Sequence, residues 1–307
     1  MTPAPLHLDV ADAPPGGRAV WLTASDGVRI RAAHWPGGAR GTVVIVPGRT
    51  ECIEKYGLVV ADMVAAGYHA VVIDVRGQGL AARLLPDAMV GHVGSFMDYY
   101  KDMRALLPIL DELPRPRFLL AHSMGGTIAL RALLEGFPVA RVAFSSPMLG
   151  IRFARGVAPL ARGMAGLASL FGRGTAYAPG TGPATYLLAA PFKGNTLTTD
   201  EGTWNWMKRQ VTAHPELALG GPSFGWVQAA LAECRALSRL PAPDIPALTL
   251  LGSAEKIVDT EAIQRRMATW PGSRLVIRPG AEHEVLMEAP RLRAEAMRAI
   301  LDHFAAA

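Results

Sequence analysis

Short runs of apolar residues alternate along this chain with stretches of helical character, and this alternation constrains the fold more than any other feature. Strands that are apolar on both faces are typical of a parallel sheet covered by helices on both sides. The sequence therefore predicts an α/β fold, which begins with an antiparallel hairpin at 19–36 that turns at Asp26 and Gly27. The apolar runs are TVVIV at 42–46, HAVVID at 69–74, RFLLA at 117–121, ALTLL at 247–251 and RLVI at 274–277.

The alternation stops between residues 148 and 240. This segment is rich in glycine, proline, methionine and aromatic residues, and it holds helical stretches at 156–171 and 203–213. We interpret it as a cap inserted over one end of the sheet. The core would then be discontinuous, with residues 1–147 and 241–307 forming one α/β domain and residues 148–240 forming the cap.

Two segments compete for the G-x-S-x-G pattern, which places a nucleophilic serine on a sharp turn between a strand and a helix. GPSFG at 221–225 has both glycines, whereas AHSMG, centred on Ser123, has Ala121 at the first glycine position. Ser123 nevertheless follows an apolar strand and precedes a helical stretch, as the turn requires. Ser223 follows a loop and starts a helix, which is typical of an N-cap. We therefore predict Ser123 as the nucleophile, because alanine adds only a methyl group to the turn.

A serine hydroxyl becomes an effective nucleophile when a histidine accepts its proton. Of the eight histidines, only His283 lies in a loop directly after a late strand. His303 falls within the closing helical stretch, and strand-like alternation is expected to turn the side chain of His122 away from the site. His283 is therefore the predicted base.

Four motifs follow one another along the chain: PGRTECIEKY at 47–56, DVRGQG at 74–79, AHSMGG at 121–126 and GAEHEVLMEAP at 280–290. In this order they resemble the bacterial lysophospholipases of the L-two type, with monoacylglycerol lipases and serine-aminopeptidase-like hydrolases as broader relatives. The resemblance runs from about residue 18 to the end of the chain. It implies an α/β-hydrolase fold, with a mostly parallel eight-stranded sheet, helices on both faces and an inserted helical cap.

In enzymes of this fold the catalytic acid lies between the nucleophile and the histidine in sequence. The resemblance implies that Glu255 is this acid; relatives usually carry aspartate there, and the lysophospholipases also accept glutamate. Asp259 is the alternative, although it opens the next helical stretch and is typical of a helix cap. The resemblance further implies that the backbone amides of Arg49 and Met124 stabilise the oxyanion that forms during acyl transfer.

Apolar side chains of the cap are expected partly to pack the cap itself and partly to line a tunnel for an acyl chain. Each buried methylene of such a chain is worth about 0.8 kcal/mol. The candidate substrate-binding residues are Met148, Phe153, Trp204 and Trp226.

Several arginines could meet an anionic group. The side chain of Arg49 has two open interpretations, a structural tie to Glu51 or Asp74 and an electrostatic role. The formal net charge of +5 also favours anionic substrates or an anionic membrane surface. The cap adds three arginines that are either solvated or in contact with phosphate or membrane: Arg152, Arg155 and Arg162.

Together these patterns predict a serine carboxylic-ester hydrolase that releases a fatty acid from a lysophospholipid or monoacylglycerol through an acyl-serine intermediate. The alternatives are a short-chain esterase or aminopeptidase-like amidase with the same triad, and a catalytically idle binding protein of the same fold. No metal or organic cofactor is expected, and the lack of a Lys/Arg run argues against nucleic acid as a partner. The first residues lack the apolar region of a secretory signal. We therefore expect a cytoplasmic enzyme that contacts the inner face of the membrane peripherally.

Overall fold

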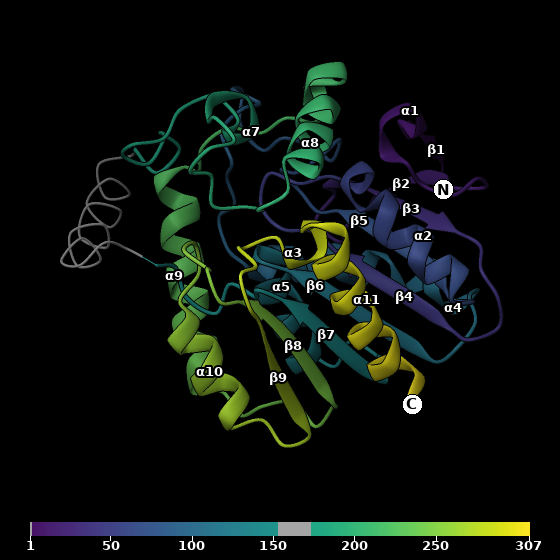
Figure 1. Cartoon of the computed structure of the whole chain (residues 1–307). Coiled ribbons are helices and arrows are strands. Elements are labelled where there is room, and N and C mark those ends of the chain that lie inside the picture. Colours follow the sequence, from purple (N-terminus) through teal and green to yellow (C-terminus); the bar gives the residue numbers. More distant parts are fainter. Residues whose placement is uncertain (1, 153–172) are drawn as a thin grey trace.

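A nine-stranded sheet forms the centre of the protein, in a computed structural model that describes residues 2–152 and 173–307 (Figure 1). The strand order is β1-β2-β3-β5-β4-β6-β7-β8-β9. The strands are β1 (Thr2–Ala4), β2 (Arg18–Thr23), β3 (Arg29–Trp35), β4 (Thr42–Val46), β5 (His69–Asp74), β6 (Arg117–His122), β7 (Arg141–Ser145), β8 (Ala247–Gly252) and β9 (Ser273–Arg278).

The pairing of the strands confirms the predicted mostly parallel α/β fold. The pairs β1/β2, β2/β3 and β3/β5 are antiparallel, and all pairs from β5 through β4 to β9 are parallel. The sheet has nine strands where eight were expected, because Thr2 and Ala4 pair with Trp21 and Ala19 to form β1. A three-residue strand that contains a proline carries no sequence pattern, and an edge position is where a sheet accepts proline.

Helices cover both faces of the sheet because successive strand residues point to opposite sides. In β4, Val44 and Val46 join the core with α3 (Met97–Ala105), α4 (Leu107–Asp111), α5 (Met124–Leu134), α9 (Phe224–Arg239) and α10 (Thr260–Ala268). Val43 and Ile45 join the core on the other face, with α2 (Gly57–Ala65) and α11 (Pro290–Ala305). Both faces are therefore buried, as the continuous apolar runs indicated.

The chain between β5 and β6 forms two short helices that follow each other directly. The stretch from Phe96 to Leu113 forms α3 and α4, which meet at Leu106. Pro108 lies in the first turn of α4, where a backbone amide would have no acceptor within the helix. The same proline could not donate a hydrogen bond within one continuous helix, so the division follows from the sequence.

The segment between β7 and β8 contributes α7 (Tyr186–Ala189), α8 (Glu201–Ala213) and α9, and no strand within its described residues. Figure 1 shows α7 and α8 beyond one end of the sheet, whereas the C-terminal end of α9 lies near α10, where Arg266 donates to the Leu237 carbonyl. Trp226, Ala230 and Leu237 of α9 share the core of α5. The assignment of residues 148–240 to a separate cap stays a prediction. None of the described helices has the length and apolar character needed to cross a membrane.

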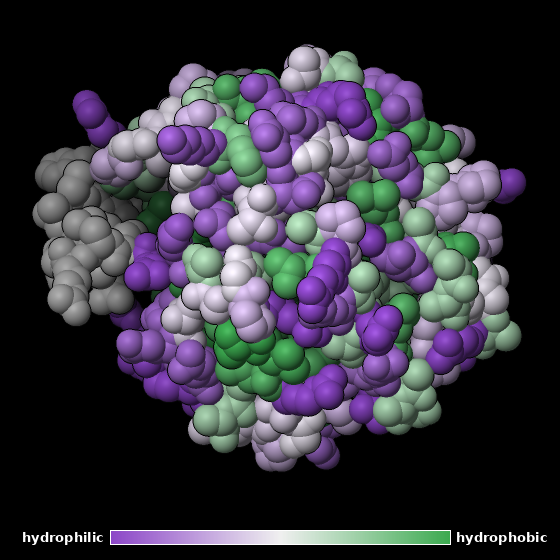
Figure 2. Space-filling view, viewed as in Figure 1, coloured by the Kyte–Doolittle hydropathy of each residue, from purple (hydrophilic) through white to green (hydrophobic). Residues whose placement is uncertain are grey.

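The outer strand β9 exposes apolar surface. In Figure 2 a hydrophobic patch lies over this strand, where Ile277 is 43% exposed. Arg274 and Arg278 flank the patch within the same strand. Cationic side chains on an edge strand oppose pairing with another chain, so the exposed Arg274 disfavours such pairing at β9.

Candidate active site

Ser123 occupies the turn between β6 and α5. Its φ of 49° and ψ of −119° are strained values for a residue with a side chain. The Ser123 amide donates to the Ser145 carbonyl at 3.0 Å, and the Ser123 carbonyl accepts from the amides of Gly126 and Met148, both at 2.8 Å. The end of β7 and the segment after it therefore hold the turn in this conformation.

The glycine pattern of the turn has a clear steric basis. A Cβ atom on Gly125 would lie only 2.2 Å from the Val46 carbonyl oxygen, so this position requires glycine. Ala121, in contrast, is fully buried at the end of β6 and fits within the core. The pattern can therefore lose its first glycine at Ala121 but not its second at Gly125.

The structure brings Ser123, His283 and Glu255 together at one edge of the sheet. Ser123 follows β6, Glu255 follows β8, and His283 lies between β9 and the short helix η3 (Val285–Met287). Ser123 Oγ lies 2.9 Å from His283 Nε2, and His283 Nδ1 lies 2.6 Å from Glu255 Oε2. A proton on Nδ1 that is donated to Glu255 leaves Nε2 free to accept the Ser123 proton.

Glu255 and Asp259 have different surroundings. The second carboxylate oxygen of Glu255 accepts from the amides of Ile257 at 2.6 Å and Val258 at 3.1 Å. Burial alone would raise the pKa of Glu255, but the hydrogen bond from His283 and these amides outweigh it and lower the pKa below its usual value. Asp259 instead accepts from the Ala262 amide at 3.0 Å as the N-cap of α10. The geometry supports Glu255 as the acid.

The loop after β4 holds the other residues expected at the oxyanion. Its backbone is fixed on both sides of Arg49: the Gly48 amide donates to Glu51, and the Thr50 amide donates to Gln78 Oε1 at 2.7 Å. Among the described residues, no acceptor is bound to the amide of Arg49 or to that of Met124. Both residues line the same cavity as Ser123. Arg49 and Met124 thus each offer a backbone amide without an acceptor in the described chain, as an oxyanion hole requires.

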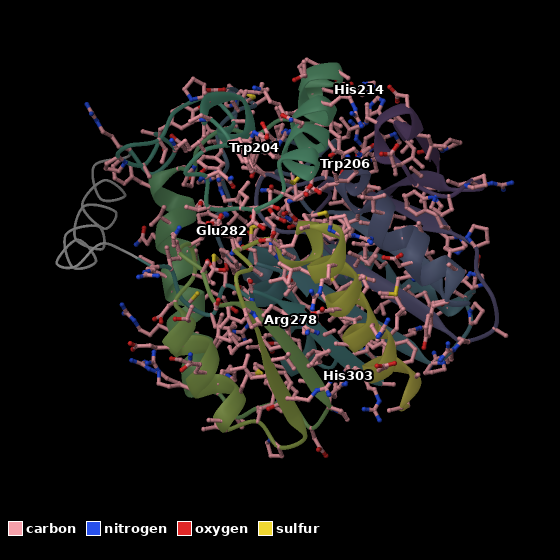
Figure 3. All side chains as sticks on the ribbon, in the orientation of Figure 1. Trp204, Trp206, His214, Arg278, Glu282 and His303 are labelled. Atoms are coloured by element: carbon pink, nitrogen blue, oxygen red, sulfur yellow. The ribbon has the colours of Figure 1, made fainter. Side chains whose placement is uncertain are left out.

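A cavity of about 300 Å³ opens on Ser123 and His283. Met148 and Trp226 line it, as expected from the sequence. Trp204 does not, and this expectation is corrected: on α8 it packs behind the lining residue Tyr186, with ring centroids 5.9 Å apart (Figure 3). Phe153 lies outside the described residues. The remaining apolar lining comes mainly from Ile151, Leu187, Leu197, Pro222, Ile257 and Val258.

The Arg49 side chain is tied neither to Glu51 nor to Asp74, which corrects that interpretation. It donates to the Gly220 carbonyl, and its guanidinium carbon lies 5.4 Å from the centroid of the Trp226 ring. Of the cap arginines, Arg152 donates to the Glu255 carbonyl at 3.0 Å, whereas Arg155 and Arg162 lie outside the described residues.

His122 also differs from expectation, because it lines the cavity instead of pointing away from the site. Its ring centroid lies 4.8 Å from that of His283. Beside it, the Lys55 ammonium lies 2.5 Å from one oxygen each of Glu51 and Glu284. All four side chains are buried. This network was not predicted, because Glu51 and Lys55 lie far from His122 and Glu284 in the sequence.

The network holds two carboxylates but only one ammonium. Burial raises the pKa of Glu284 to about 7, although Lys55 partly opposes this effect. For Glu51, burial is outweighed by Lys55, and the pKa falls to about 2. Near neutral pH the network therefore gains or loses one proton, next to the predicted catalytic base.

The excess of carboxylates over ammonium groups in this network predicts that the stability of the fold depends on pH. Between about pH 4.3, the usual pKa of glutamate, and pH 7, folded Glu284 keeps a proton that the unfolded chain has released. Glu284 should therefore make the free energy of unfolding about 1 kcal/mol lower at pH 8 than at pH 6. Urea unfolding at the two pH values should show this decrease in wild type and in the control Glu112→Gln, where the glutamate is exposed. An undiminished decrease in Glu284→Gln would contradict the explanation.

The competing serine has a structural role. Ser223 is buried and caps α9, where its Oγ accepts from the Trp226 amide at 3.0 Å and lies 2.7 Å from His92 Nδ1. His303 lies on α11, with its Nε2 3.0 Å from the Val142 carbonyl oxygen (Figure 3). Neither residue lines the cavity.

Two groups of side chains among the described residues have the spacing of metal ligands. One combines Glu51, His122 and Glu284, but the Lys55 ammonium already supplies the cation there. The other, which does not line the cavity, is formed by His7, Asp9 and His214.

Several known hydrolases are similar to this chain in sequence. The sequence model of a family described as "Serine aminopeptidase, S33" matches residues 37–290. The chain is 35% identical to lysophospholipase L2 of Escherichia coli strain K12, over 90% of this chain and 83% of the relative. It is 31% identical to a probable lysophospholipase L2 of Haemophilus influenzae, over 86% of this chain and 83% of that protein.

Solved structures show the same fold at lower sequence identity. The monoacylglycerol lipase of Paleococcus ferrophilus aligns with a TM-score of 0.70 and 21% identity, covering 90% of this chain and 98% of that chain. A monoglyceride lipase of Saccharomyces cerevisiae aligns with a TM-score of 0.72 and 17% identity, covering 92% of this chain and 93% of that chain.

Proposed function

The chain belongs to the serine aminopeptidase S33 family of α/β-hydrolases, and from this premise we propose that it releases the fatty acid from glycerolipids with one acyl chain. The observation that carries the proposal is the continuous hydrogen-bonded path from Ser123 through His283 to Glu255 at the floor of a largely apolar cavity. The ester carbonyl would lie above Ser123, and the acyl chain would occupy the apolar part of the cavity.

Each residue of this path has a role in the proposed reaction. His283 Nε2 takes the Ser123 proton while Oγ attacks the ester carbonyl, and Glu255 stabilises the imidazolium that forms. The amides of Arg49 and Met124 stabilise the oxyanion of the tetrahedral intermediate. His283 then protonates the leaving glycerol oxygen, which yields acyl-Ser123 and the free alcohol. Finally, His283 activates a water molecule that releases the fatty acid and restores Ser123.

Two observations support a lipid ester as the substrate. Both curated relatives are named for lysophospholipids, and the solved neighbours for monoacylglycerols. The exposed surface of the cavity is mostly apolar, as the acyl chain of a lipid ester requires. The net charge of +5 supports contact with the anionic membrane surface from which such lipids come, and we extend the proposal to an enzyme that acts there.

An aminopeptidase-like amidase is the second candidate, because the matching family is named for serine aminopeptidases. An amidase of that kind needs a free carboxylate to bind the ammonium of its substrate. The carboxylates that line the cavity, Glu51 and Glu284, already share the ammonium of Lys55. Among the described residues the lining thus offers no unpaired carboxylate, which favours an ester.

A substrate panel tests the proposal. We expect kcat/KM on p-nitrophenyl esters to rise about fourfold per added methylene, equivalent to about 0.8 kcal/mol each, until the cavity is filled. Lysophosphatidylcholine, lysophosphatidylethanolamine and a monoacylglycerol with matched chains should release fatty acid, whereas aminoacyl p-nitroanilides should not react. A preference for the acetyl ester would favour a short-chain esterase, and cleavage of the anilides alone would favour an amidase. Lack of reaction with every compound would favour an idle binding protein.

A further inference from the structure

Arg49 and Lys55 are the lysine and arginine residues that line the cavity within the described chain. Lys55 is neutralised by Glu51 and Glu284. Arg49 has no carboxylate partner among the described residues, and its Nε is buried without a hydrogen bond. Burial lowers the pKa of Arg49 to about 10, so the guanidinium is still charged at neutral pH. Among the described residues, Arg49 is therefore a cation of this cavity whose charge no carboxylate compensates.

The few contacts of Arg49 distinguish it from arginines with a structural role. Arg83 also has no carboxylate partner in the described part of the chain, but it donates to the carbonyls of Gly77, Gly79, Glu216 and Ala218. Within the same residues, Arg49 donates to the Gly220 carbonyl alone. A guanidinium has five N–H donors arranged to bind planar or tetrahedral oxyanions. Donors of Arg49 therefore remain available at the cavity.

The guanidinium is also held in position. The Trp226 ring packs against it, with 5.4 Å between the guanidinium carbon and the ring centroid. On Gly91, a Cβ atom would lie 2.8 Å from Arg49 Nη2, so the backbone there approaches the guanidinium closely. These contacts fix the orientation of the group without neutralising it, and a fixed group loses little entropy when it binds a ligand.

The backbone amide and the guanidinium of Arg49 suit the ester carbonyl and the phosphate of a lysophospholipid, respectively. Its amide is the proposed donor to the ester carbonyl oxygen, and its guanidinium packs on Trp226, which lines the same cavity. The number of covalent bonds from the amide nitrogen to the guanidinium carbon matches that from the ester carbon to the phosphorus of a 1-acylglycerol phosphate. One residue could therefore contact both groups of one substrate.

We propose that the Arg49 guanidinium binds the phosphate of the substrate, so that this site distinguishes lysophospholipids from neutral monoacylglycerols. The inference rests on the proposed function, since it names the substrate class that the same cavity prefers. Phosphate pairs with arginine through charge-assisted hydrogen bonds that can be bidentate, whereas a glycerol hydroxyl offers a single neutral contact.

The test compares two substrates that differ only in the phosphate, 1-octanoylglycerol and 1-octanoylglycerol 3-phosphate, both below their micellar concentrations. Octanoate release gives kcat/KM for each, and the ratio of phosphate to neutral substrate is the measured quantity. We expect this ratio to fall about 10- to 100-fold in Arg49→Met. Arg49→Lys keeps the charge but loses the planar fork, so its ratio should fall by less. If Arg49→Met does not fold, the ratio measured for Arg49→Lys still tests the inference.

Arg83→Met is the matched control, because it removes the same charge from an arginine that does not line this cavity. Its ratio should equal that of wild type. Equal losses on both substrates in Arg49→Met, which leave the ratio within twofold of wild type, would overturn the inference and indicate a structural role. An equal fall in Arg83→Met would also overturn it, because net charge alone would then explain the effect. Failure of wild type to hydrolyse either substrate would instead overturn the proposed function.

Discussion

Replacement of Ser123 with alanine is expected to lower kcat for ester hydrolysis by about six orders of magnitude. The change removes the only atom that can form the acyl intermediate, while His283, Glu255 and the amide of Met124 remain in place. The residual rate should approach that supported by substrate binding and the oxyanion donors alone. Release of fatty acid from a monoacylglycerol, measured at saturating substrate, checks the prediction.

Ser223→Ala is the matched control, because it removes the hydroxyl of the other serine in a G-x-S-x-G context. Ser223 caps α9, so its loss should cost about 1 kcal/mol of stability and leave kcat within a few-fold of wild type. Thermal unfolding of both variants separates folding from catalysis. A loss of less than tenfold in Ser123→Ala, with the fold intact, would contradict the assignment of the nucleophile.

Replacement of Glu255 with glutamine should lower kcat by about three to four orders of magnitude. An amide cannot stabilise the imidazolium, and it can hold the His283 ring in the wrong tautomer, with the proton on Nε2. The two backbone amides that now bind Glu255 can still bind the glutamine oxygen, so the loop should keep its shape. Initial rates on a p-nitrophenyl ester give the loss.

Asp259→Asn tests the other acidic candidate. Asparagine caps helices about as well as aspartate, so α10 should persist and kcat should change by less than about threefold. A larger loss in Asp259→Asn than in Glu255→Gln would reverse the assignment of the acid.

Much of the architecture was predictable because its determinants are local. The runs at 42–46, 69–74 and 117–121 are apolar on both faces, which only a covered parallel sheet accommodates. Ser123 could be selected over Ser223 because the strand before it and the helix after it are visible in the sequence. The distance between His283 and Ser123 then follows from the topology, since parallel strands end at a common edge.

Other features depend on packing between distant segments and carry no local pattern. Lys55 and Glu284 are 229 residues apart, and their ion pair exists only because η1 (Ile53–Tyr56) and the loop after β9 meet below the cavity. The two interpretations of Arg49 stayed open for the same reason, and the tie is excluded only because Lys55 pairs with Glu51 and Arg31 pairs with Asp74. Trp204 was misjudged because an aromatic residue in the cap can face the cavity or pack behind another ring.

Ester hydrolysis by this chain requires Ser123 to be an activated nucleophile, and covalent labelling with a fluorophosphonate measures this most directly. Intact-mass spectrometry should show a single adduct on wild type and none on Ser123→Ala. Peptide mapping should locate the phosphonate on Ser123. An unlabelled wild type, or an adduct on Ser223, would contradict the account.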